Sequence, residues 1–178
     1  GSGSWATALA KIVMHNAPEI NWHIRKQETI DEFVEIRRNP NHLEWAYFDV
    51  SRIHFSADIN AVIEQSDLLV LAVPSPYLKQ SLNDIKVDMS NKMVISAVKG
   101  MIPDENLLVT EYMHQYFHVP KENLGVIAGP CHAEEIALER LSYLTVGCKD
   151  MQKAIEWSKL FDTPYVRTTP SNDVEGLE

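Results

Sequence analysis

Apolar residues follow two alternating patterns along the chain. From residue 7 to residue 16 they recur at helical spacing, through Ala8, Ile12 and Val13, which predicts a helix. The stretches DLLVLAVPS, KMVISAVKG and LGVIAGP are instead continuous apolar runs, as in strands that are buried on both faces of a parallel sheet. The two kinds of segment alternate from one end of the chain to the other.

The complete pattern predicts seven strands and seven helices. We expect strands at residues 19–22, 52–58, 67–75, 92–100, 124–130, 143–148 and 163–169, and helices at residues 7–16, 29–39, 58–66, 75–85, 105–117, 131–140 and 150–161. Thr29 with Glu32 forms a predicted capping box, Asp58 a predicted N-cap, and Pro40 is expected to end the second helix. Alternating strands and helices are typical of an α/β fold with a doubly wound, mostly parallel, Rossmann-like sheet.

The opening stretch GSGSWATALA carries the first candidate chemistry. Gly1, Gly3 and Ala6 occupy the three positions of a Gly-x-Gly-x-x-Gly/Ala turn. Such a turn brings backbone N–H groups close to a pyrophosphate, at the positive end of the helix that follows. Because the motif normally follows a strand, we expect the first strand of the sheet to be missing from this chain.

The end of the next strand bears on the choice of cofactor. An NAD site places an acidic residue there, about 20 residues after the turn, to bind the ribose hydroxyls. This chain reads NWHIRK at that point, with Arg25 and Lys26 and no acidic residue before Glu28. A guanidinium can hold a 2′-phosphate, so these residues favour NADP(H). The alternative is two solvated basic residues on a loop.

Composition narrows the classes of function. The 178 residues carry a formal net charge of −9, which argues against a nucleic-acid partner. No apolar run is long enough for a membrane span and no signal peptide is visible. Cys131 and Cys148 form no disulfide framework, which indicates a reducing cytoplasm. His114 and His118 lack a third ligand, so we expect no metal site.

Four motifs resemble one known family. GSGSWATALA, LAVPS, SAVKGM and AGPCHAEEIA occur in order at matching intervals. Together they resemble the bacterial type of NAD(P)-dependent glycerol-3-phosphate dehydrogenase, over nearly the whole chain. That family reduces dihydroxyacetone phosphate to glycerol 3-phosphate by reversible hydride transfer, for phospholipid synthesis. Two positions depart from its pattern: Cys131 stands where the family usually has serine, and His132 where it has phenylalanine.

The resemblance implies a set of site residues. It places substrate contacts at Lys99, Gly129 and Cys131, and cofactor contacts at Gly1, Gly3, Ser4, Trp5, Arg25, Lys99 and Ala133. It implies a dinucleotide-binding domain over residues 1–168, with residues 169–178 beginning the connection to an absent helical domain. The general acid/base lysine is expected in that domain, beyond Glu178. NADP or NAD is the implied cofactor, a small phosphorylated molecule the substrate, and a homodimer an assembly that the intact protein can form.

Other interpretations stay open at this point. Lys99 can be a surface lysine after a strand. Cys131 lies at a helix start, where a thiol pKa is lowered, but only the adjacent His132 could serve as its base, so covalent catalysis is not expected. The chain can also be part of a different NAD(P)-dependent enzyme, such as a hydroxyacid or ketopantoate reductase. It can also be a regulatory module that binds a dinucleotide without catalysis.

Overall fold

The computed structural model describes residues 1–178 and contains two sheets. β1 (Ile20–His23) and β2 (Ile53–Ser56) form a parallel pair. The second sheet has the order β3-β4-β5-β6-β7, and its strands are Leu68–Leu71, Met93–Ser96, Leu124–Ala128, Ser142–Cys148 and Val166–Ser171. Only the β5–β6 pair is antiparallel. The prediction of a mixed α/β fold with a mostly parallel sheet is confirmed.

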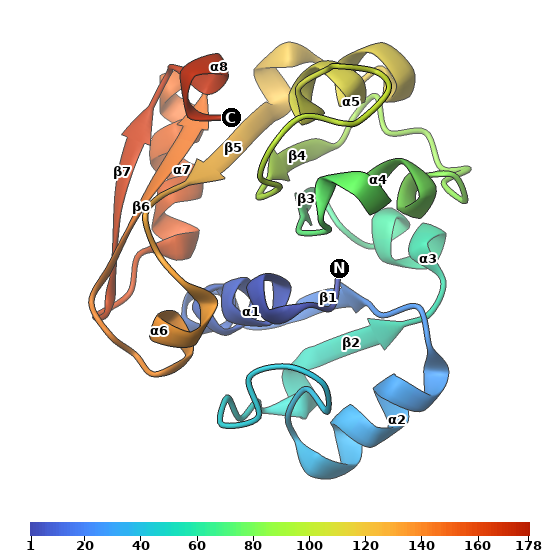
Figure 1. Ribbon diagram of the computed structural model, residues 1–178, viewed down its shortest axis with the longest axis vertical. Coiled ribbons are helices and arrows are strands. Elements are labelled where there is room, and N and C mark those ends of the chain that lie inside the picture. The colour runs from blue at the N-terminus through green and yellow to red at the C-terminus, as the bar shows by residue number, and fades with distance from the viewer.

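Helices connect the strands in the predicted order. They are α1 (Ser4–Asn16), α2 (Gln27–Ile36), α3 (Ile59–Glu64), α4 (Ser75–Leu82), α5 (Val109–Phe117), α6 (Ala133–Ala137), α7 (Met151–Phe161) and α8 (Val174–Leu177). Figure 1 shows β1, β2 and α2 at one end of the molecule and the five-stranded sheet with its helices at the other. α1 lies between these two parts and packs against both α6 and α7.

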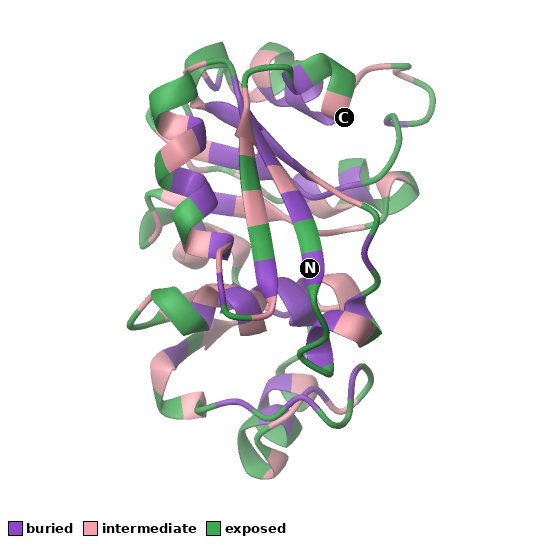
Figure 2. Ribbon diagram, turned by 90° about the vertical axis from the view of Figure 1, so that its left-hand side faces the viewer, coloured by how far each residue is buried: buried purple, intermediate pink, exposed green.

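α1 holds the two sheets in one core. Its buried positions are Ala6, Thr7, Ala8, Leu9, Ile12 and Met14, and the alanines let neighbouring elements approach closely while favouring the helix. The largest buried cluster runs from Trp22 and Phe33, through this helix, to Trp157 and Phe161. Figure 2 shows buried residues along the strands and inward helix faces, and exposed residues on the outer faces.

An apolar groove separates the facing edges of β1 and β3. It has a volume of about 750 Å³ and is lined mainly by hydrophobic residues, including Ile20, Leu68 and Val70. The N-terminus of the chain lies between these two strands (Figure 1), and Gly1 lines the groove. Each of the two edge strands therefore pairs with a partner on one side only.

Three local predictions were wrong. α2 begins at Gln27, after Lys26, so Thr29 lies inside the helix and caps nothing. The same helix ends at Ile36 because Arg37 turns into the left-handed conformation, with φ of 56°, before Pro40 is reached. The fifth helix begins at Val109 rather than near residue 105, since Ile102–Leu107 closes a tight bridge ahead of it.

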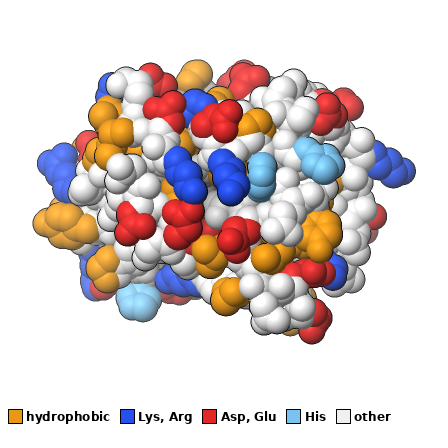
Figure 3. Space-filling model, turned by 90° about the horizontal axis from the view of Figure 1, so that it is seen from above, with side chains coloured by type: hydrophobic (Ala, Val, Ile, Leu, Met, Phe, Trp, Pro, Cys, Tyr) orange, Lys and Arg blue, Asp and Glu red, His pale blue; other side chains and the backbone are white.

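The C-terminal residues pack onto the second sheet. β7 runs through residues 168 and 169, where the sequence suggested a boundary, and α8 contacts β5 and β6. The Glu178 carboxylate accepts hydrogen bonds from the backbone N–H and hydroxyl of Thr110. No helix is long and apolar enough to cross a membrane. On the face above α5 and α8, acidic and basic side chains are interspersed (Figure 3).

Candidate functional site

The glycine turn combines one crowded glycine with one open glycine. A Cβ at Gly1 would stand 2.0 Å from the carbonyl oxygen of Ala72, so the chain cannot carry a side chain there without moving β3. A Cβ at Gly3 would meet nothing within 4 Å. Since Gly3 has an ordinary φ of −77°, neither its conformation nor the protein around it requires glycine. The free space beside Gly3 is the space that a ligand needs to approach the backbone.

The carbonyl groups of this turn point into the protein. Gly1 O accepts a hydrogen bond of 2.8 Å from the indole of Trp22, and Ser2 O one of 3.0 Å from the carboxamide of Asn39. Gly3 O accepts from the N–H and the hydroxyl of Thr7, both at 2.9 Å. In a trans peptide the C=O and the following N–H point in opposite directions, and no peptide of the chain is cis.

The N–H groups of Ser2, Gly3 and Ser4 therefore face away from their bracing residues. The two that lie ahead of α1, those of Ser2 and Gly3, donate no hydrogen bond to another backbone group. They stand at the N-terminus of a 13-residue helix, which presents roughly half a positive charge. Unpaired donors at a helix start suit an anion such as a pyrophosphate, and the open space beside Gly3 fits its approach.

The side chain of Lys99 extends from the second sheet toward the glycine turn of residues 1–4, which we call the first corner. Lys99 lies three residues after the end of β4 and is exposed, and the neighbouring Gly100 has φ of 88°. Its ammonium lies 5.8 Å from the centre of the Trp5 ring, within the range of a cation–π interaction. The Trp5 indole nitrogen is buried without a hydrogen-bond partner. The structure thus brings Lys99 and Trp5, two of the predicted site residues, into contact.

The start of α6, with Gly129, Cys131 and Ala133, lies beside Lys99, and we call it the second corner. A Cβ at Gly129 would stand 2.4 Å from the carbonyl oxygen of Tyr143, so β6 requires glycine at this position. Cys131 and Ala133 are buried, and α6 packs against α1. Burial raises the pKa of the Cys131 thiol, and the nearby charge of Lys99 lowers it by less. A thiol of raised pKa is a poor nucleophile at neutral pH, in line with the expectation that it does not catalyse covalently.

Arg25 lies just past the end of β1, near Gly1. His23 also lines the groove; burial lowers its pKa, and the charge of Arg25 contributes further. Arg25 itself is exposed and forms no ion pair with an acidic side chain.

Four residues at this corner were not anticipated from the sequence. Trp22, Asn39 and Thr7 hold the carbonyls of the turn, and the His42 ring lies 3.2 Å from the Ser4 hydroxyl. Asn39 and His42 come from the segment after α2, more than 30 positions along the chain from their partners. Only the Asn-Pro-Asn sequence at residues 39–41 marked that segment as a turn.

Known proteins resemble this chain over its whole length. Residues 1–154 match the family described as NAD-dependent glycerol-3-phosphate dehydrogenase N-terminus. A glycerol-3-phosphate dehydrogenase [NAD(P)+] of Oceanobacillus iheyensis is 31% identical over 185 residues, covering 100% of this chain and 52% of that protein. The corresponding protein of Bacillus subtilis is 29% identical over 182 residues, again with 100% and 52% covered.

Solved structures agree with these relatives. The glycerol-3-phosphate dehydrogenase of Plasmodium falciparum is 29% identical with a TM-score of 0.82, covering 95% of this chain and 50% of that one. A dehydrogenase structure of Dunaliella salina, with a TM-score of 0.86 at 21% identity, covers 99% and 33% and shows the shared fold. The chain spans about half the length of its curated relatives. With the glycine turn, the parallel sheet and these matches, it belongs to the family of NAD(P)-dependent glycerol-3-phosphate dehydrogenases and represents their N-terminal, NAD-binding part.

Proposed function

We propose that this chain is the cofactor-binding part of an enzyme that reduces dihydroxyacetone phosphate to sn-glycerol 3-phosphate, in phospholipid synthesis. The observation that carries the proposal is the glycine turn, whose carbonyls are held inward so that its N–H groups face an open space beside Lys99. A bound nicotinamide cofactor would supply the hydride. The residues of this chain bind and orient the cofactor and the substrate, and polarise the substrate carbonyl.

Each predicted residue has a role in this proposal. The N–H groups of the turn from Gly1 to Ser4 hold the pyrophosphate, Trp5 and Ala133 line the cofactor site between α1 and α6, and Arg25 binds the 2′-phosphate of NADP. Lys99 pairs with the substrate phosphate or polarises its carbonyl oxygen as negative charge develops there. Because the Cys131 side chain is buried and a thiol is a weak donor, its backbone N–H is the group that meets the substrate, together with Gly129.

Cofactor titration and turnover test this proposal separately. The 178-residue chain should bind NADPH weakly, but more tightly than it binds NADH, as followed by quenching of its tryptophan fluorescence. It should not turn over dihydroxyacetone phosphate, because the general acid/base lysine is proposed to lie in a helical domain after Glu178. Turnover by this chain alone would contradict the proposed division of labour, and no dinucleotide binding at all would contradict the proposed function.

We also propose that a strand joined to Gly1 lies in the groove between β1 and β3. Gly1 meets Ala72, directly after β3, and the groove runs from there between the two unpaired strand edges. An extended segment that leads to Gly1 through this groove would run parallel to both strands and join the sheets.

Extending the chain tests that arrangement. Five apolar strand-forming residues added before Gly1 should raise the melting temperature by roughly 5 °C or more, because they bury apolar area and complete two ladders. The control is the same extension with proline at its centre, which cannot donate to the ladder. Equal melting temperatures for the two extended chains would contradict the proposal.

We propose further that the intact protein works in the cytoplasm as a homodimer, without nucleic acid. Both cysteines are free and buried, which supports a reducing compartment, and the net charge of −9 disfavours a polyanion. Leu138, Leu141 and Tyr143 form an exposed apolar group beside α6 that supports contact with another copy or domain. Light scattering of the intact protein, with and without DNA, checks the homodimer and the absence of nucleic-acid binding.

A further inference from the structure

Asn39 is the central polar residue behind the glycine turn. Only 1% of its surface is exposed. Its carboxamide nitrogen donates to Ser2 O at 3.0 Å and to the Thr7 hydroxyl at 2.8 Å. The Thr7 hydroxyl in turn donates to Gly3 O at 2.9 Å. Asn39 thus holds Ser2 O directly, and it orients the Thr7 hydroxyl, which adds a second hydrogen bond to the one that the Thr7 backbone N–H gives Gly3 O.

The local sequence fixes the position of Asn39 itself. Pro40 restricts the residue before it to extended conformations. The side-chain oxygen of Asn39 accepts a 3.0 Å hydrogen bond from the backbone N–H of Asn41, which closes an Asx turn. Both amide hydrogens and the oxygen are therefore used, and the carboxamide can be neither flipped nor turned without losing them.

We propose that Asn39 is a positioning residue for the dinucleotide, and this inference rests on the proposed cofactor-binding function. Asn39 holds Ser2 O inward and, through the Thr7 hydroxyl, reinforces the backbone hydrogen bond that holds Gly3 O. It thereby fixes the N–H groups of Gly3 and Ser4 outward, since each N–H opposes the preceding C=O. Those two N–H groups are then fixed, before binding, in the direction of the pyrophosphate. Asn39 touches no ligand atom in this proposal and acts only through the backbone of the turn.

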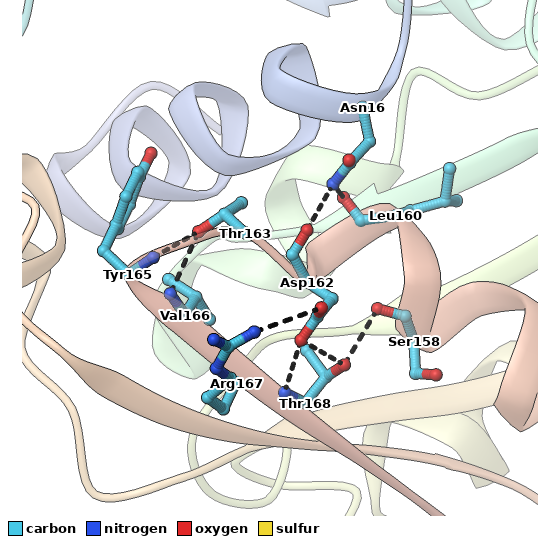
Figure 4. A network of polar contacts seen from close by, with 9 residues as sticks. All are labelled: Asn16, Ser158, Leu160, Asp162, Thr163, Tyr165, Val166, Arg167 and Thr168. Carbon is cyan, nitrogen blue, oxygen red and sulfur yellow. Dashed lines mark hydrogen bonds and ion pairs between the residues drawn. The ribbon is translucent and has the colours of Figure 1, made fainter.

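Asn16 offers a matched control. Its carboxamide nitrogen also donates two hydrogen bonds, to Leu160 O at 3.1 Å and to Asp162 O at 2.8 Å. Figure 4 shows this carboxamide between the end of α1 and the segment after α7, within a separate polar network. Asn16→Ala therefore removes the same number of donated side-chain hydrogen bonds, two, at the opposite end of the same helix.

The test compares two ligands on the 178-residue chain. Asn39→Ala should raise the Kd for NADPH about tenfold or more, because the N–H groups lose their fixed direction. Adenosine 2′-phosphate lacks the pyrophosphate, and its Kd should change by less than about twofold. Asn39→Asp keeps the acceptor for Asn41 but cannot donate to Ser2 O, and should weaken NADPH at least as much. Asn16→Ala should leave both affinities unchanged.

Several results would overturn the inference. Wild-type NADPH affinity in Asn39→Ala, or equal losses for both ligands, would show that Asn39 serves the fold alone. If Asn39→Ala does not fold, Asn39→Asp takes its place: it keeps the acceptor for Asn41 and loses the donations to Ser2 O and the Thr7 hydroxyl, and an unchanged NADPH Kd in that variant would overturn the inference equally. A wild-type chain that binds no dinucleotide would overturn the proposed function together with this inference, whereas normal wild-type binding with an unaffected variant would overturn this inference alone.

Discussion

Two helix starts meet at one rim of the molecule, and they are built differently. α1 has 13 residues, and three separate segments brace the carbonyls of its glycine turn. α6 has five residues, and the glycine ahead of it is forced by the backbone of β6. A short helix has a weak dipole and frays. The first corner can hold an anion through its backbone, whereas the second depends on the ammonium of Lys99.

The largest expected effect concerns Lys99 at the second corner. Under the proposed function, Lys99→Met in the intact protein should lower kcat/KM for dihydroxyacetone phosphate by about 10²–10³-fold, as removal of a group that stabilises developing charge does. Lys92→Met is the control: that lysine lies just before β4, at the opposite end of the strand, and donates to Ser66 O. Steady-state kinetics of both variants would test this prediction. Equal values of kcat/KM for Lys99→Met and Lys92→Met would contradict the distinction between the corners.

The next effect contrasts two glycines. Gly3→Ala should raise the NADPH Kd about tenfold or more, because the methyl group occupies the space beside the turn. Its unfolding free energy should change by less than about 0.5 kcal/mol, since no protein atom is near. Gly129→Ala should instead destabilise the fold by about 1–3 kcal/mol, because its Cβ would meet Tyr143 O. Urea unfolding and NADPH titration of both variants would test this contrast. A destabilised Gly3→Ala that binds NADPH normally, or a Gly129→Ala of unchanged stability, would contradict it.

A smaller effect is expected at Arg25, which lies near the first corner. Arg25→Ala should weaken NADPH about tenfold, since a charge-assisted contact to the 2′-phosphate is lost. NADH lacks that phosphate, so its Kd should stay within about twofold. Lys26→Ala provides the neighbouring comparison. A loss of NADPH affinity in Lys26→Ala, with Arg25→Ala unaffected, would move the 2′-phosphate contact to the next residue.

The smallest effect is expected at Cys131. Because its side chain is buried and the proposed substrate contact is made by the backbone, Cys131→Ser should change kcat/KM by less than about threefold. The wild-type thiol should also react slowly with iodoacetamide at pH 7, since burial raises its pKa. Rapid alkylation with loss of activity would show that the thiol does more than fill space.

The order of elements and the glycine turn could be predicted from the sequence, because both are local signals. Apolar spacing distinguished strands from helices, and the glycine positions marked the turn. The boundaries of α2 and α5 could not, since a left-handed Arg37 and a bridge between Ile102 and Leu107 compete with the residues that usually mark helix ends. Burial could not be predicted from residue type either, since Phe48 is buried but its aromatic neighbours Trp45 and Tyr47 are exposed.

The hydrogen bonds that hold the carbonyls of the turn also could not be predicted from the sequence. Asn39 and Trp22 meet the first residues of the chain only because α2 and β1 fold back against α1, and no spacing rule describes contacts between positions 21 to 37 residues apart. Lys99, Trp5 and the start of α6 were assigned by resemblance. Their proximity follows from the parallel sheet, which brings the carboxyl ends of its strands to one rim.

The central claim is that the backbone N–H groups of the glycine turn hold the dinucleotide. Titration of the ¹⁵N-labelled chain with NADPH, followed by amide chemical shifts, tests it most directly. Gly3, Ser4 and Trp5 should show the largest shifts, with smaller ones around Lys99 and Ala133, and Gly3→Ala should move the midpoint of the titration to an NADPH concentration about tenfold higher or more. Saturable binding whose shifts lie elsewhere, with the turn unmoved, would contradict the claim.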